Sequence, residues 1–164
     1  MNRKNTLAGL LPVLFSFFVM GFVDVVGVAT SYVKADFSLS DRIANLLPMM
    51  VFLWFAVCSL PAGVLMGRIG RKRTVMASAV VTFVAMLLPL ADYSFPVVLT
   101  AFALLGIGNT AIQVAVNPLL ATIVPGERMT SYLTVGQIFR NASLLLLAPV
   151  VTALTARTGS WRLL

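Results

Sequence analysis

The sequence predicts an all-α polytopic membrane protein with five transmembrane helices and the start of a sixth. Hydrophobic residues make up 60% of the 164 residues and charged residues only 10%, whereas a soluble domain is roughly 45–50% apolar and about 25% charged. The mean hydropathy is +1.00. Five apolar runs approach or exceed the roughly 20 residues that a helix needs to cross a bilayer. The lipid bilayer is therefore the expected environment of most side chains.

The five predicted helices follow one another with short polar connections and no linker that would divide the chain. The first run follows Arg3 and Lys4, as a signal peptide would, but it exceeds the 7–15 apolar residues of a signal sequence and is predicted to span the membrane. The second run contains Pro48 and Pro61, which transmembrane helices tolerate. After the fifth run, residues 159–164 are typical of the beginning of another helix. The predicted helices cover about residues 7–33, 46–66, 74–90, 97–124 and 132–156.

The net charge of +7 predicts membrane orientation rather than nucleic-acid binding. The basic residues lie mainly between the apolar runs, where Lys and Arg favour the cytoplasmic side. A cytoplasmic N-terminus places seven of them inside and four outside. The inner set is Arg3, Lys4, Arg68, Arg71, Lys72, Arg73 and Arg128, and the outer set is Lys34, Arg42, Arg157 and Arg162. We therefore expect a multi-pass protein of the cell membrane with its N-terminus in the cytoplasm.

The composition argues against an enzyme and against a bound metal or cofactor. The chain has no His, which is the commonest metal ligand and general base, and its single Cys58 lies within an apolar run. No nucleophile, base and orienting group fall on one predicted helix face. We expect no catalytic residues and no metal site.

Asp24 is an acidic residue inside the first apolar run. A charged side chain at the centre of a bilayer costs about 2.5–3.5 kcal/mol on insertion scales, so such residues usually face a cavity or a partner. Asp24 is therefore predicted to lie on a substrate or ion pathway. The alternative is a structural ion pair or a carboxylate that reaches interfacial water.

The fourth predicted helix carries three carboxamides at intervals of four residues, Asn109, Gln113 and Asn117. This spacing predicts one polar stripe that faces protein or water. Amides donate and accept hydrogen bonds, so they suit the hydroxyl groups of neutral polyols. The alternative is hydrogen bonding between helices with no ligand.

The fifth predicted helix repeats the pattern with Gln137, Arg140 and Asn141. At 1.5 Å per residue, Arg140 and Gln113 lie at similar depth, and both are predicted to line one cavity. Asp24 is expected about 10 Å nearer the outer side. We therefore state an Asp24–Arg140 ion pair as a hypothesis.

Residues 63–73, between the second and third predicted helices, resemble the loop signature of the major facilitator superfamily, G-x-x-x-D-R-x-G-R-[RK]. The sequence departs from this signature at one position, where Gly67 replaces the Asp. The resemblance assigns a role in conformational change to this loop. Its residues are Gly63, Arg68, Gly70, Arg71 and Lys72, which match the signature, and Gly67, which does not.

Further motifs are similar, in order and spacing, to those of the fucose–galactose–proton symporter family. They lie at residues 21–24, 37–40, 60–63, 113–118 and 136–139. In this resemblance Gln113 stands where the fucose symporter has a Glu, Asn117 matches an Asn of the same motif, and Gln137 matches a Gln of the sugar cavity. Arg140 stands where that symporter has an Asn, and Asp24 lies about one turn before its proton-linked Asp.

The resemblance implies the N-terminal part of a twelve-helix sugar permease that works by alternating access, with the C-terminal half absent from these residues. Its substrate would be a monosaccharide held by Asn109, Gln113, Asn117, Gln137, Arg140 and Asn141. Asp24 is the candidate site for a coupling proton, and the alternatives are coupling to another ion and facilitated diffusion. One alternative is an exporter or carrier of drugs or organic anions that uses Arg140. Another is a membrane module that transports nothing.

Overall fold

The computed structural model describes residues 3–158, and within this range the chain is helical apart from short connections. The sequence-predicted beginning of a sixth helix lies outside the described residues. The elements are α1 (Arg3–Asp24), α2 (Val26–Asp36), α3 (Asp41–Ala44), α4 (Leu46–Ile69), α5 (Arg71–Ala91), α6 (Phe95–Ile123), the 3-10 turn η1 (Gly126–Arg128) and α7 (Met129–Thr158).

Five helical segments of the described chain are long and apolar enough to cross a membrane. The predicted all-α membrane fold is therefore confirmed. Several observed helices extend beyond the predicted apolar runs, because charged residues continue a helix where it leaves the hydrocarbon region of the bilayer. The basic residues expected in a loop after the second run thus lie at the end of α4 and the start of α5, joined by Gly70 alone. Gly70 has a φ of 87°, which favours glycine.

The first membrane segment is broken in the structure, whereas the sequence predicted one continuous helix. Helix α1 ends at Asp24 and α2 begins at Val26. The apolar pattern continues through the break, so hydropathy gives no signal of it. The break places the carboxylate of Asp24 at a helix end in the middle of the segment.

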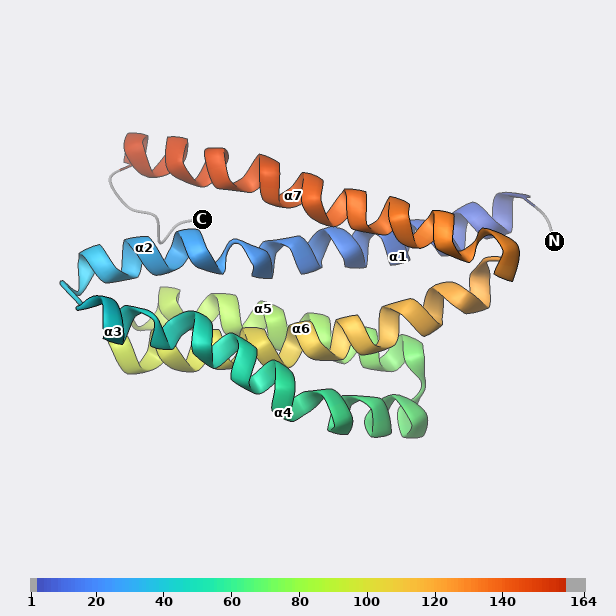
Figure 1. The fold of residues 1–164 in the computed structure, drawn as a ribbon, viewed down its shortest axis with the longest axis horizontal. Helices are drawn as coiled ribbons and strands as arrows, with labels where there is room; N and C mark the ends of the chain where they lie inside the picture. Colours follow the sequence, from blue (N-terminus) through green and yellow to red (C-terminus); the bar gives the residue numbers. More distant parts are fainter. Residues whose placement is uncertain (1–2, 159–164) are drawn as a thin grey trace.

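Helix α6 is the centre of the arrangement and packs against α4, α5 and α1, while α1 also packs against α7. Figure 1 shows α7 beside α1 and α2 on one side of the molecule, with α4, α5 and α6 together on the other. One cluster of buried side chains joins α1 to the second half of α6 and another joins α1, α2, α4 and the first half of α6. The two groups of helices therefore meet along α1 and α6.

Glycines allow the closest approaches between these helices. A Cβ atom at Gly106 would overlap the backbone carbonyl oxygen of Val51 on α4, and one at Gly108 would overlap the hydroxyl of Thr82 on α5. Gly63 and Gly67, whose spacing is typical of close helix packing, have nothing within 4 Å of an added Cβ. Within the described residues this pair makes no close helix contact, since a small residue permits an approach and does not cause one.

Candidate functional site

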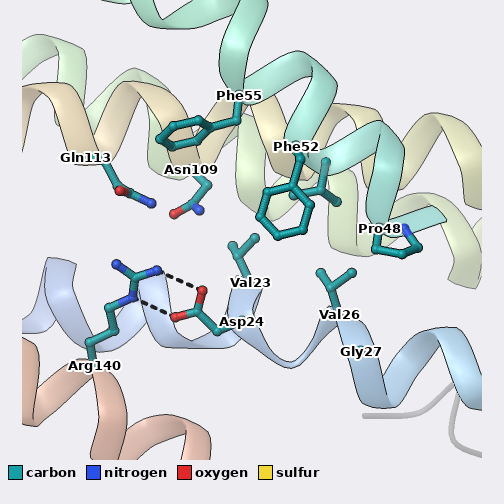
Figure 2. A pocket seen from close by; sticks show the side chains of 11 residues that line it. Val23, Asp24, Val26, Gly27, Pro48, Phe52, Phe55, Asn109, Gln113 and Arg140 are labelled. Atoms are coloured by element: carbon teal, nitrogen blue, oxygen red, sulfur yellow. Dashed lines mark hydrogen bonds and ion pairs between the residues drawn. The ribbon is translucent and has the colours of Figure 1, made fainter. Parts of the chain in front are cut away.

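A cavity of about 510 Å³ lies beside the break between α1 and α2. Helices α4, α6 and α7 complete its walls, so segments distant in sequence meet there (Figure 2). Its lining combines two charged side chains, two carboxamides and an apolar wall. The lining residues are Val23, Asp24, Val26, Gly27, Pro48, Val51, Phe52, Phe55, Asn109, Gln113 and Arg140.

Asp24 and Arg140 form a bidentate ion pair across this cavity. Arg140 Nε donates to Asp24 Oδ2 at 2.6 Å, and Arg140 Nη2 donates to Asp24 Oδ1 at 2.8 Å. The side chain of Arg140 is 22% exposed and that of Asp24 is 29% exposed. Two parallel N–H···O bonds fix the relative orientation of the two planar groups. The hypothesis of an Asp24–Arg140 pair is confirmed.

The expected offset in depth of about 10 Å between the two residues does not keep their side chains apart. That value assumed straight helices parallel to the membrane normal. Because α1 ends at Asp24 and packs against α7, the carboxylate and the guanidinium meet directly. The pair leaves the cavity lining with no net charge, since Asp24 and Arg140 are its only ionisable residues among the described lining.

A close backbone contact between α1 and α7 fixes the relative position of the Asp24–Arg140 pair. Gly21 lies three residues before Asp24, and a Cβ there would be 2.5 Å from the backbone carbonyl oxygen of Arg140. The hydroxyl of Ser143 donates to that same carbonyl at 2.6 Å. The ion pair therefore sits one turn from a point where α1 and α7 touch through their backbones.

The two carboxamides of the cavity come from consecutive turns of α6. Asn109 is 5% exposed, and its Oδ1 atom has no hydrogen-bond partner among the described residues. Gln113 is partly buried and lies on the same side of α6. Figure 2 shows both amides facing the space above the Asp24–Arg140 pair. A buried acceptor without a partner costs free energy unless a ligand or water satisfies it.

An aromatic wall from α4 closes the opposite side of the cavity. Phe52 and Phe55 line it together with Pro48 and Val51. Phe52 and Phe55 were not among the site residues predicted from the sequence. The spacing of these four residues at three and four positions places them on one helix face, and this was the available signal.

The chain matches a known protein family and two curated proteins over most of its length. The family model of the Major Facilitator Superfamily matches residues 13–164. The chain belongs to the major facilitator superfamily. It is also 31% identical over 144 residues to a glucose/galactose transporter of Brucella abortus biovar 1 strain 9-941, and equally to one of strain 2308. These alignments cover 85% of this chain and 35% of each relative.

Membership in the major facilitator superfamily, whose members are multi-pass membrane transporters rather than enzymes, confirms the resemblance inferred from the loop signature. The chain spans about a third of the length of the curated relatives it matches, as the 35% coverage states. Within residues 3–158, no group of three or more Cys, Asp or Glu side chains is placed to hold a metal ion.

Three residues predicted to bind substrate lie outside the cavity lining of this superfamily member. Asn117, Gln137 and Asn141 are exposed and do not line it. Each step of four residues turns a helix by about 40° and advances it by about 6 Å, so Asn117 lies about 12 Å along α6 from Asn109 and on a rotated face. The predicted single stripe is therefore divided, and only its first two members meet the ion pair.

The superfamily loop signature lies away from the cavity. Arg68, Gly70, Arg71 and Lys72 are all exposed. Arg71 Nη1 donates to the backbone carbonyl oxygen of Pro118 at 3.1 Å, which connects the α4–α5 turn to the second half of α6. The two segments are thus linked at the end of α6 that lies beyond the carboxamides.

Proposed function

We propose that this chain forms part of a transporter of neutral monosaccharides and that the cavity at the α1–α2 break is a portion of its sugar site. The observation that carries the proposal is a mostly apolar cavity in which four hydrogen-bonding side chains converge without net charge. The relatives named as glucose/galactose transporters support a hexose as the substrate class.

The donors and acceptors of the cavity match the hydroxyl groups of a sugar. A guanidinium has five N–H donors, and Asp24 uses two of those of Arg140, which leaves three for a ligand. The carboxylate of Asp24 retains further lone pairs, and the carboxamides of Asn109 and Gln113 supply both kinds of group. Phe52 and Phe55 offer apolar faces for the C–H side of a pyranose ring, as expected of a mostly apolar pocket with a few placed polar groups.

The transport mechanism that fits this site is alternating access. In transporters built from inverted repeats, the substrate lies near the midplane beside discontinuous helices, and the helix bundles rock around it. The α1–α2 break beside the cavity suits such a site. We assign the remaining walls, and the partners of Gln137 and Asn141, to further helices of the same transporter, in a cell membrane with the N-terminus of this chain in the cytoplasm.

Asp24 is the carboxylate through which sugar uptake would be coupled to protons. Arg140 occupies both oxygens of the Asp24 carboxylate, so a proton would reach them only when the pair opens. Sugar hydroxyls that bond to Arg140 would weaken the pair and help this opening. Uptake would then respond to an inward proton gradient.

Transport of organic anions is the second candidate function, and the partly buried guanidinium of Arg140 is the observation that favours it. The bidentate bond to Asp24 cancels this positive charge, which favours neutral solutes over anions. A membrane module that transports nothing does not explain the unpartnered Oδ1 of Asn109 in a cavity.

The test is uptake of labelled D-glucose and D-galactose by the full natural protein in proteoliposomes. We expect saturable uptake that unlabelled hexoses inhibit and small carboxylates do not. Asn109→Leu should weaken apparent hexose affinity at least about tenfold, because it removes the amide at nearly constant volume. Asn45→Leu changes an exposed carboxamide outside the cavity and is the matched control.

Two outcomes would contradict the proposal. One is inhibition by carboxylates without inhibition by hexoses, which would make the protein an anion carrier. The other is hexose uptake that Asn109→Leu and Asn45→Leu affect equally. Repeating uptake with the proton gradient collapsed tests coupling separately, since a proton symporter would lose accumulation of hexose against its concentration gradient, whereas a uniporter would show no change.

A further inference from the structure

Arg140 is a cation whose charge is cancelled by one residue within the cavity. Among the described residues that line the cavity, Asp24 is the only anion and Arg140 the only cation. The other charged side chains described on the packed helices lie near helix ends and connections, such as Lys34, Asp36 and Arg71. The net charge experienced by a ligand in this cavity therefore depends on a single carboxylate.

The geometry of the pair shows what its removal would leave. Nε and Nη2 of Arg140 are held in the parallel arrangement that matches the two oxygens of a carboxylate. Asp24 is on α1 and Arg140 on α7, and the close approach at Gly21 and Ser143 holds the backbone of Arg140 independently of the Asp24 side chain. Without the Asp24 carboxylate, this pair of donors would face the cavity unpaired (Figure 2).

From this arrangement we infer that Asp24 is a specificity-determining residue: by occupying the paired donors of Arg140, it excludes sugar acids from the site and keeps the site selective for uncharged sugars. This inference rests on the proposed sugar site and names its substrate class more closely. Arg140 has the converse role, because it occupies the carboxylate of Asp24 and excludes amino sugars that carry an ammonium group. Each member of the pair thus prevents the other from selecting a charged ligand.

The inference predicts opposite changes for the two single substitutions. Asp24→Ala opens space beside the free guanidinium, so D-glucuronate and D-galacturonate should gain affinity over D-glucose and D-galactose. Arg140→Gln leaves a lone carboxylate, so D-glucosamine should gain affinity over D-glucose. Because hydrogen bonds to charged groups are strong, each change of preference should be at least about tenfold.

The experiment measures equilibrium binding of these sugars to the purified full natural protein in detergent. Each uronate differs from its hexose only at C6, so the two probes isolate the effect of the carboxylate. Asp24→Glu retains the negative charge and is the matched control, which should not bind uronates better than the wild type does. The double variant Asp24→Ala with Arg140→Gln removes both charges and should favour neither charged probe.

The outcomes separate this inference from the proposed function. The inference is supported if Asp24→Ala gains uronate binding and the double variant loses it again. This holds even if the wild type binds no hexose, and in that case only the proposed hexose function fails. Hexose binding by the wild type, with no uronate gain in a folded Asp24→Ala protein, overturns the inference and leaves the sugar site intact. If Asp24→Ala does not fold, Arg140→Gln decides: an amino-sugar gain supports charge cancellation, and an unchanged preference overturns it. A wild type that binds uronates as tightly as hexoses also overturns it.

Discussion

Replacing Gly21 with alanine tests the contact that holds the cavity together between α1 and α7. The added Cβ would lie 2.5 Å from the backbone carbonyl oxygen of Arg140 and would also overlap the hydroxyl of Ser143. Ser143 can rotate away, but the carbonyl is part of α7. Since carbon–oxygen contacts between helices are about 3.3–3.6 Å, the two helices must separate by about 1 Å at this point.

The separation has an energetic cost and a functional one. Overpacking costs about 1–3 kcal/mol, which exceeds the roughly 0.5–1 kcal/mol that alanine gains over glycine within a helix. A net loss of about 1 kcal/mol would lower the melting temperature by roughly 2–4 °C for a chain of this size. A shift of about 1 Å would also stretch the Asp24–Arg140 bonds, now 2.6 and 2.8 Å, beyond hydrogen-bonding distance.

The assay is thermal unfolding of the purified protein followed by circular dichroism at 222 nm, together with hexose binding. Gly63→Ala is the matched control, because an added Cβ there meets nothing within 4 Å. This control should melt at or slightly above the wild-type temperature and bind hexose normally. If Gly21→Ala melts as high as Gly63→Ala and binds sugar equally well, then α1 and α7 do not approach as described and the argument fails.

Three further predictions concern other parts of the fold. Gly70→Ala should destabilise the protein by roughly 1–3 kcal/mol, because alanine must adopt a φ of 87° with a ψ of 156°, a region occupied essentially by glycine. An unchanged melting temperature would show that the turn has another conformation. Arg71→Ala should speed amide hydrogen exchange in α6 around Pro118 by removing the bond to its carbonyl oxygen, whereas Lys72→Ala should not, and equal rates in both variants would count against this link. Phe52→Ala should weaken hexose binding several-fold without lowering stability, since Phe52 lines the cavity and is 71% exposed; a loss of stability with unchanged binding would assign it to packing.

The polar residues of the candidate site were predictable because each of them lies inside an apolar segment, where a polar side chain needs a partner or a cavity. Asp24 and Arg140 are charged groups inside hydrophobic runs, and the cost of leaving either alone in lipid predicts that they find a partner. The pair therefore followed from composition and approximate depth. Asn109 and Gln113 followed from the same argument applied to amides.

The aromatic wall and the division of the carboxamide stripe were not predictable in this way. Phe52 lies in an apolar run where contact with lipid, packing and a cavity wall have the same hydrophobic signature. Asn117 shares its spacing with Asn109 and Gln113, yet a rotation of about 40° for each four residues moves it from the cavity. No proline marks the break at Val25, and the adjacent Asp24 does not by itself predict it.

By itself, the sequence determined that the chain is a bundle of membrane-spanning helices, because the cost of exposing polar groups to lipid is a sum over local residues and can be read along the chain. It also determined which polar side chains need partners. Only the tertiary structure decided which of them meet, because convergence depends on the rotation, tilt and interruption of helices that pack at Gly21 and Gly106. Shifts of about one ångström at such contacts decide whether Asp24 and Arg140 form two hydrogen bonds or none.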